Sequence, residues 1–374
     1  MKVADRRALL VLAAGAISQP LLKRPAASAV QSAPPAAEPF SNESVLALLK
    51  QNKVAGVSLA VIENGQLVAA YGYGDAQEQR PVTPQTRFQA ASISKTVNAL
   101  GVLKLVQAGR VALDDPINNH LKSWKLPDNA LTAKTPVTVR MLLNHTGGMS
   151  VHGFEGYARG SVLPSLRQIL DGQEPANSAA IQVVSPPGQA FKYSGGGTTI
   201  LQQMVIDITG DPYDVAMEKL VLGPLGMSES SFRQPPDPET VDQAAFAHLA
   251  DGSPAAGGFH IYPEMAAAGL WTTASDLCKP ALAIMQSNAG RAGSFLNQDL
   301  VRAMLTRGLG QYGLGVMLNN RGWFSHDGGN WGYSALFTAD PKRISAAAAM
   351  TNNDNGLALC GDLVKRVAKA YHWT

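Results

Sequence analysis

The sequence predicts an α+β fold, an α/β sandwich in which an antiparallel sheet built from both chain ends is flanked by helices and carries an inserted helical lobe. β-rich runs occupy residues 57–62 and 66–73 near one end, and residues 332–339 and 344–351 near the other. The sequence between these runs has mainly helical patterns. Strands at both ends with helices between them favour this fold class over a helical bundle or a β-sandwich.

The order of these elements predicts one domain at residues 40–374, made of two lobes. Residues 40–90 and about 260–374 are expected to form the sheet lobe, and residues from about 91 to 259 the mainly helical lobe. A cleft between two such lobes is the usual place for a small-molecule site.

Each terminal pair of strands has a turn signal. Asn64-Gly65 joins the first pair, and Asn-Gly is the strongest short signal for a β-hairpin. The polar residues 340–343 join the last pair. Residues 41–51 before the first strand and residues 356–371 after the last strand have the periodicity of amphipathic helices.

The helical lobe is predicted from apolar periodicity and from stop signals. Gly109 and Gly210 follow two of its helices, as glycine commonly does at a helix C-terminus. Pro280 lies inside another helical pattern, so a kink is expected there. The expected helices cover residues 93–108, 139–145, 198–209, 214–220 and 273–287.

The first 29 residues are expected to be an export signal, which makes the mature protein periplasmic or secreted. They combine a basic start, an apolar run at residues 8–17 and a small-residue stretch at residues 26–29. Paired arginines in the basic start resemble a twin-arginine signal. The alternative is a disordered amphipathic tail. Residues 30–39 have the composition of a Pro/Ala linker.

The net charge argues against nucleic acid as a partner. Without residues 1–29, which hold five basic and one acidic side chain, the formal charge changes from +3 to −1. No basic stripe remains to bind nucleic acid or an anionic membrane, and no membrane span is expected in the mature chain. The oligomeric state stays open. Cys278 and Cys360 lie in apolar helical patterns, so two free thiols are favoured over one disulfide.

Ser92 and Lys95 are the candidate nucleophile and base. Residues three apart on a helix share a face, so the lysine amine lies over the serine hydroxyl. An amine made neutral by desolvation can accept the serine proton. The surroundings of this pair are apolar, and no other Ser-x-x-Lys occurs in the chain. The pattern therefore indicates acyl transfer through a serine ester.

Tyr193 is the candidate second proton-handling group. It lies in Tyr193-Ser194-Gly195, between a rigid Pro-Pro-Gly turn and a run of glycines that opens a helix. A tyrosine fixed between cations is expected to titrate below its solution pKa and to act as general acid or base. The alternative is a tyrosine that merely packs at a helix start.

His326-Asp327-Gly328-Gly329 is the third candidate element, expected just before a terminal strand. Its glycines let the backbone approach a ligand closely, so the N–H of Gly329 is expected to join that of Ser92 as an oxyanion hole. A Ser-His-Asp triad within residues 325–327 is rejected, because neighbouring residues on a strand point to opposite faces.

Other catalytic patterns are absent from the sequence. It contains no Gly-x-Ser-x-Gly, His-Glu-x-x-His or paired Cys-x-x-Cys, so neither a nucleophile elbow nor a zinc site is expected. No cofactor or metal is predicted. His145, at the end of an expected helix, is interpreted as a structural residue that caps carbonyl groups.

The three motifs together resemble those of serine β-lactamases and penicillin-binding proteins, in their class C-like branch. This branch includes esterases of the β-lactamase fold, D-alanyl-D-alanine carboxypeptidases and D-aminopeptidases. The resemblance spans about residues 41–371 and implies a β-lactamase/transpeptidase-like fold. The segments that carry it are Ser92-x-x-Lys95, Tyr193-Ser194-Gly195, His326-x-Gly328 and residues 88–92, 142–148, 222–227 and 351–353.

The resemblance implies an acyl-enzyme on Ser92, with Tyr193 shuttling protons. Two departures bear on the substrate. Gly195 stands where β-lactamases of this branch have an asparagine that contacts the acylamino group, and His326 stands where they usually have a lysine that binds the substrate carboxylate. Gly195, His326 and Gly328 are the candidate substrate-binding residues, with His326 charged only part of the time near neutral pH.

Both departures weaken recognition of β-lactams and favour an exported carboxylesterase for small esters. The expected partner is a small ester, amide or peptide substrate. A D-Ala-D-Ala carboxypeptidase, D-aminopeptidase or β-lactamase remains the alternative, and a penicillin-recognising sensor that acylates without turnover is a further one.

Overall fold

A computed structural model describes residues 40–373; the predicted export signal and linker lie outside the described residues. Its main sheet has seven antiparallel strands in the order β3-β2-β1-β11-β10-β9-β8. The strands are β1 (Gly56–Glu63), β2 (Gln66–Gln77), β3 (Arg80–Pro81), β8 (Met317–Leu318), β9 (Phe324–Asn330), β10 (Tyr333–Asp340) and β11 (Ser345–Thr351). Two small sheets pair β4 (Phe88–Gln89) with β7 (Trp271–Thr272) and β5 (Tyr157–Ala158) with β6 (His260–Ile261).

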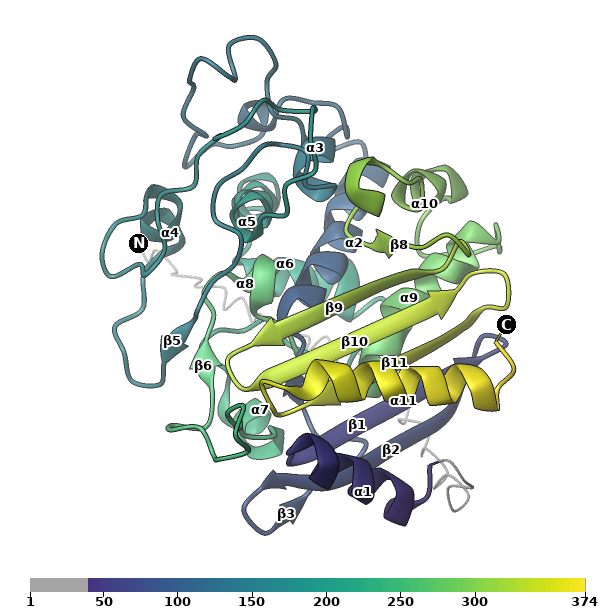
Figure 1. The fold of residues 1–374 in the computed structure, drawn as a ribbon. Coiled ribbons are helices and arrows are strands. Elements are labelled where there is room, and N and C mark those ends of the chain that lie inside the picture. Colours follow the sequence, from purple (N-terminus) through teal and green to yellow (C-terminus); the bar gives the residue numbers. More distant parts are fainter. Residues whose placement is uncertain (1–39, 374) are drawn as a thin grey trace, which may run out of the picture. The chain divides into compact units, whose positions relative to one another are not determined.

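Helices are the main regular elements of the segment between the two groups of strands (Figure 1). The α-helices are α1 (Asn42–Asn52), α2 (Ser94–Gln107), α3 (Val139–Leu143), α4 (Leu166–Asp171), α5 (Gly195–Thr209), α6 (Tyr213–Met217), α7 (Pro238–Gln243), α8 (Met265–Ala268), α9 (Ala274–Asn288), α10 (Gln298–Met304) and α11 (Gly356–Ala370). Shorter turns are η1 (Ala91–Ile93), η2 (Ile117–Asn119), η3 (Glu218–Leu222) and η4 (Leu309–Gln311).

The two chain ends meet in the centre of the sheet, as predicted. β1 pairs with β11, so the first and last long strands of the sequence are neighbours. Asn64 and Gly65 both have positive φ, the conformation that a tight two-residue hairpin requires. The predicted α+β class, with a sheet built from both ends, is confirmed.

Both faces of the sheet are covered, because its central strands alternate between two apolar cores. Val57, Leu59 and Val61 of β1 pack under α1 and α11, whereas Ala60 and Ile62 face the larger core on the side of α9. Figure 1 shows α1 and α11 together on one face of the sheet. Two-sided burial explains why alanine-rich β11 is stable as a strand.

The third motif lies just before the predicted strand β10, as expected, but it is itself part of a strand that was not predicted. His326 to Gly329 lie within β9, which forms an additional hairpin with β10. Helix α5 also begins earlier than expected, at Gly195, where the Ser194 side chain caps it.

Helix α2 positions the candidate nucleophile at the centre of the molecule. Eleven of its residues are buried, so it is an interior helix rather than an amphipathic surface helix. Cys278 and Cys360 are both buried free thiols, as favoured from the sequence. Within residues 40–373, no helix is long and apolar enough to cross a membrane.

Candidate active site

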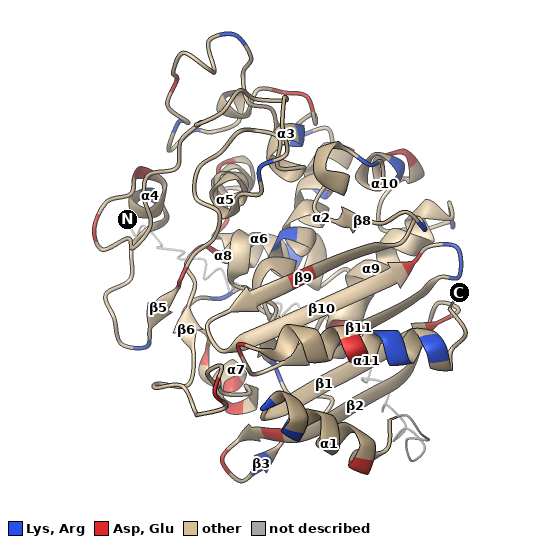
Figure 2. Ribbon diagram, viewed as in Figure 1, with Lys and Arg blue, Asp and Glu red and all other residues tan. Residues whose placement is uncertain are grey.

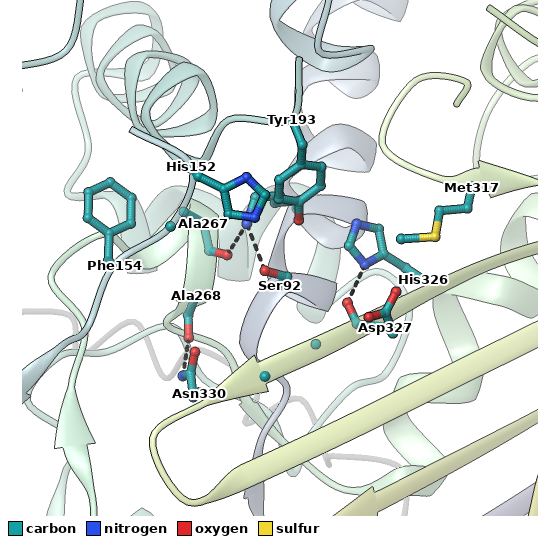
Figure 3. A pocket seen from close by; sticks show the side chains of 14 residues that line it. Ser92, His152, Phe154, Tyr193, Ala267, Ala268, Met317, His326, Asp327 and Asn330 are labelled. Atoms are coloured by element: carbon teal, nitrogen blue, oxygen red, sulfur yellow. Dashed lines mark hydrogen bonds between the residues drawn. The ribbon is translucent and has the colours of Figure 1, made fainter. Parts of the chain in front are cut away.

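A cleft of about 340 Å³ opens over the Ser92 side chain. Residues of η1, α2, α8, β8 and β9 and of the connections before α5 line it, so both predicted lobes contribute (Figure 3). Its lining residues are Ser92, Lys95, His152, Gly153, Phe154, Tyr193, Ala267, Ala268, Met317, His326, Asp327, Gly328, Gly329 and Asn330.

Ser92 lies in η1, the turn immediately before the first residue of α2. The preceding residue, Ala91, has a φ of 49°, which is rare for a residue with a side chain and stores backbone strain. This turn brings Ser92 Oγ to 3.0 Å from Lys95 Nζ. Lys95 Nζ also donates a hydrogen bond of 2.8 Å to the carbonyl oxygen of Ala267 in α8. The predicted serine–lysine pair is therefore in direct contact.

Burial makes the Lys95 amine a base. Only 4% of this residue is exposed, and desolvation lowers its pKa from 10.5 to about 7, while the nearby Asp327 carboxylate opposes this shift. Near neutral pH a large fraction of Lys95 is therefore uncharged. A neutral amine has a lone pair that can accept the Ser92 proton.

Tyr193 lies against the same pair, but its ionisation differs from the prediction. Its hydroxyl is hydrogen-bonded to the Ser92 side chain, and Lys95 Nζ is 5.1 Å from its ring centroid. Burial raises the Tyr193 pKa well above 10, and the charge of Asp327 raises it further. The expectation of a lowered pKa was wrong, because desolvation of the buried hydroxyl is the largest influence on it. Tyr193 is thus a phenol that can donate a proton.

The two glycines of β9 have different roles. A Cβ on Gly328 would lie 2.4 Å from the Ala90 oxygen and 2.9 Å from the Ser92 nitrogen, so the absence of a side chain lets β9 approach η1. A Cβ on Gly329 would meet nothing within 4 Å. Gly328 is therefore needed for close packing beside the nucleophile, whereas Gly329 faces open space.

The strand register orients the Gly329 amide. A two-residue turn joins β9 to β10, so Asn330 and Tyr333 form the hydrogen-bonded pair that closes the hairpin. Paired residues alternate, which places Gly329 in a non-hydrogen-bonded pair with its N–H directed away from β10. β8 pairs with the first two residues of β9, so at Gly329 this edge lies beside η1.

The comparisons agree with this geometry. A profile of the family described as Beta-lactamase matches residues 42–369. The chain belongs to the beta-lactamase family. The predicted resemblance, the hydrolase class and the β-lactamase/transpeptidase-like fold are thereby confirmed.

Curated relatives of this beta-lactamase-family chain include an esterase. Esterase EstB of Burkholderia gladioli is 29% identical over 325 residues, which cover 78% of each protein. Protein flp of Staphylococcus aureus (strain MRSA252) is 26% identical over 193 residues, which are 50% of this chain and 36% of that protein.

Solved structures of proteins with different described activities have a similar fold. The octameric penicillin-binding protein homologue of Pyrococcus abyssi has a TM-score of 0.69 at 25% identity, covering 84% of this chain and 73% of that one. EstCE1, described as a hydrolase with promiscuous acyltransferase activity, has a TM-score of 0.68 at 20% identity. The match covers 86% of this chain and 95% of that one.

His326 does not act as the partly charged group that was expected. It is 1% exposed, and burial lowers its pKa to about 3, with the Lys95 charge as a further cause. Nδ1 donates to the Asp327 carbonyl oxygen (2.6 Å), so Nε2 accepts from the Tyr312 hydroxyl (2.8 Å). The neutral ring lines the cleft but offers no cation to a substrate carboxylate near neutral pH.

Gly195 does not line the cleft, in contrast to the prediction. It is buried at the start of α5, and a Cβ there would lie 3.0 Å from Phe154 Cε2. The aromatic ring occupies the space in front of this position. In this chain of the beta-lactamase family, Phe154 therefore faces the cleft where an asparagine side chain would otherwise extend.

His145 packs beside Tyr193 rather than capping a helix with its side chain. Its ring centroid is 4.3 Å from that of Tyr193, and its Nδ1 accepts a hydrogen bond from the Ser194 N–H. The exposed His152 ring lies on Tyr193 as well, at 5.1 Å. Two imidazoles thus hold the phenol over Ser92.

Eight residues that line the cleft were not predicted as site residues: His152, Gly153, Phe154, Ala267, Ala268, Met317, Asp327 and Asn330. Asp327 and Asn330 flank the glycines of β9, and the only signal for them was their position beside the third motif. The Asn330 amide donates to Gln89 Oε1 and to the Ala268 oxygen, which ties β9 to α8. His152 and Phe154 lie in a connection without a recognisable pattern.

Proposed function

We propose that the mature protein is a carboxylesterase that forms an acyl-enzyme on Ser92. The observation that carries this proposal is the 3.0 Å contact between Ser92 Oγ and a buried Lys95 amine whose pKa is about 7. A serine hydroxyl beside a neutral amine is an activated nucleophile at neutral pH. The similarity to an esterase over 78% of the chain supports the substrate class.

Acylation begins when the Ser92 proton moves to Lys95 Nζ and Oγ attacks the ester carbonyl carbon. The negative charge on the carbonyl oxygen is stabilised by the backbone N–H groups of Ser92 and Gly329. Ser92 lies in the first turn of a helix, where amides lack an intrahelical partner. Collapse breaks the bond to the leaving oxygen. Tyr193 protonates that oxygen and regains a proton from the Lys95 ammonium.

Deacylation runs through the same groups. Lys95, neutral again, takes a proton from water as the water oxygen attacks the acyl carbon. The bond to Ser92 Oγ then breaks, Oγ recovers a proton, and a carboxylic acid leaves. Each turnover consumes one ester and one water and releases one alcohol and one acid.

The charges in the cleft favour an ester without a carboxylate. His326 is neutral, and the Asp327 carboxylate lines the cleft without a hydrogen bond or ion pair to another described residue. Figure 2 shows an acidic position on β9, where Asp327 is the only acidic residue. A substrate carboxylate would meet repulsion here, which argues against β-lactams and acyl-D-Ala peptides.

Export of the protein is part of the proposal. It rests on the basic start, apolar run and small-residue stretch of residues 1–29. Fractionation of cells that express the full chain, with mass determination of the mature N-terminus, would test it. Cytoplasmic retention of an uncleaved chain would contradict export.

Hydrolysis of p-nitrophenyl butyrate by the mature protein and by Ser92→Ala tests the activity, with a chromogenic cephalosporin in parallel. The proposal predicts ester turnover that is lost in Ser92→Ala and a much lower kcat/KM for the cephalosporin. Equal ester turnover in the variant would exclude the Ser92 mechanism. Preferred cephalosporin turnover would instead identify a β-lactamase.

A further inference from the structure

The position of Phe154 is fixed by contacts with the Tyr193-Ser194-Gly195 motif. Four hydrogen bonds tie the backbone before it to the start of α5. Gly195 N–H donates to the His152 oxygen (2.8 Å) and Gly196 N–H to the Val151 oxygen (3.1 Å), and Ser194 Oγ donates to the Val151 oxygen (2.9 Å) and the Ser150 oxygen (2.6 Å). Val151 has a φ of 57°, a strained conformation for a β-branched residue. The ring is therefore held at the cleft by backbone contacts.

The cleft has two chemically different ends. In Figure 3 Phe154 lies on one side of Ser92, beyond Ala267 and Ala268, whereas Asp327 and Met317 lie on the other. The Phe154 end is lined by an aromatic ring and two alanines, together with the His152 imidazole and the Asn330 side chain. The other end carries a carboxylate.

The placement of Tyr193 assigns these ends to the two halves of an ester. The leaving oxygen must lie within reach of the Tyr193 hydroxyl, which is hydrogen-bonded to Ser92. Figure 3 shows the Tyr193 hydroxyl on the side of Ser92 away from Phe154. With the leaving group on that side, the acyl chain extends toward Phe154.

We propose that Phe154 determines acyl specificity by binding linear apolar acyl chains, and that glycine at position 195 is required to make room for its ring. This inference rests on the proposed esterase function. A side chain at position 195 would run into the ring, because its Cβ would lie 3.0 Å from Phe154 Cε2. The substrate class is therefore esters of simple aliphatic acids rather than N-acylamino acids.

A series of p-nitrophenyl esters tests the acyl site, because acetate, butyrate and hexanoate share one leaving group. Each methylene group buried against the ring is expected to raise kcat/KM about fourfold. The expected result is a hexanoate-to-acetate ratio of kcat/KM that falls about tenfold in Phe154→Ala. Phe154→Leu, which keeps an apolar side chain, should retain part of the ratio.

Phe295→Ala is the matched control. Phe295 is also a half-buried phenylalanine, but it contacts Lys104 and lies outside the cleft lining. Its replacement should leave the hexanoate-to-acetate ratio unchanged. Thermal unfolding of each variant shows whether it is folded before its kinetics are compared with those of the parent.

A double-mutant cycle with Gly195→Ala tests the coupling between the two positions. The added methyl group would lie 3.0 Å from Phe154 Cε2 and 3.2 Å from the His152 oxygen, so the ring must shift by a few tenths of an ångström and Gly195→Ala should lower the hexanoate-to-acetate ratio in the parent protein. It should have little further effect in Phe154→Ala, because the ring is already absent. Additive effects would show that the two positions act separately.

The outcomes separate this inference from the proposed function. Hydrolysis that depends on Ser92 but keeps its hexanoate-to-acetate ratio in Phe154→Ala would overturn the acyl site and leave the esterase in place. Absence of Ser92-dependent hydrolysis for every ester of the series would overturn both.

Discussion

Lys95 differs from a surface lysine in its surroundings. The serine hydroxyl, the Ala267 carbonyl and the Tyr193 ring surround its amine, and none of them carries a full negative charge. Desolvation therefore dominates, and the pKa falls to about 7 despite the opposing charge of Asp327. The kcat/KM for a neutral ester is accordingly expected to rise with pH through about pH 7.

Lys95→Met should lower kcat on the order of 100-fold or more, the usual scale for a lost general base. It should also change stability in a pH-dependent way. Between about pH 7 and 10.5 the unfolded chain binds a proton that the folded chain does not, so parent stability rises with pH across this window.

Urea denaturation at several pH values measures that change. Lys95→Met should have a higher free energy of unfolding than the parent. This difference should be largest at pH 7 and should shrink toward pH 10. The lost hydrogen bond to Ala267 adds a constant term that does not alter this trend. A difference independent of pH would contradict the lowered pKa.

Asp327→Asn should change both the pH profile and the charge selectivity. Because the Asp327 carboxylate raises the Lys95 pKa, its removal should shift the acidic limb of kcat/KM to lower pH. An ester that carries a carboxylate should become a better substrate, by roughly tenfold for one removed charge repulsion in a partly buried cleft. Asp362→Asn, on the exposed face of α11, is the control and should change neither quantity.

At the scale of elements, the contact between β9 and η1 sets the geometry of the oxyanion hole. Gly328→Ala places a Cβ 2.4 Å from the Ala90 oxygen and must push the strand away from Ser92. Gly329→Ala adds a Cβ in open space and keeps the backbone N–H. The two neighbouring glycines therefore give a matched pair of variants.

Gly328→Ala is expected to lower Tm and to reduce kcat on the order of 100-fold, the usual effect of losing one oxyanion donor. Gly329→Ala should keep the parent Tm, since its methyl group meets no atom within 4 Å. Thermal unfolding and ester kinetics on both variants check this. A stable, fully active Gly328→Ala would show that β9 does not set the oxyanion geometry.

The sequence was sufficient to predict these elements where a local pattern determines them. The Asn64-Gly65 turn and the apolar alternation of the terminal strands predicted the sheet from both ends. Ser92 and Lys95 were predicted to touch because helical spacing alone brings them together. The position of β9 was missed because its polar and glycine residues resemble a loop.

The ionisation of site residues could not be predicted, because it depends on contacts between distant segments. His326 is neutral because Tyr312 and the packed sheet bury it, and Tyr193 is a phenol because burial desolvates its hydroxyl. Phe154 was missed for the same reason. Its role follows from where the backbone of its loop is tied to α5.

At the scale of the molecule, one apolar core joins the predicted sheet and helical lobes. Ala60 of β1 and Ala348 of β11 belong to the same cluster as Leu100 of α2 and Ile200 of α5. A shared core couples the unfolding of its parts, so residues 40–374 should unfold in one cooperative transition. Far-UV circular dichroism and tryptophan fluorescence should give the same Tm. Separate transitions would show that the lobes are independent.

The acyl-enzyme itself is the most direct test of the mechanism. Intact-mass spectrometry of protein quenched in acid during turnover of p-nitrophenyl butyrate would detect it, with Ser92→Ala as the control. The mechanism predicts a fraction of the parent protein heavier by one butyryl group, located on the peptide that contains Ser92, and no such species in the variant. A butyryl group on another residue, or equal labelling of Ser92→Ala, would contradict it.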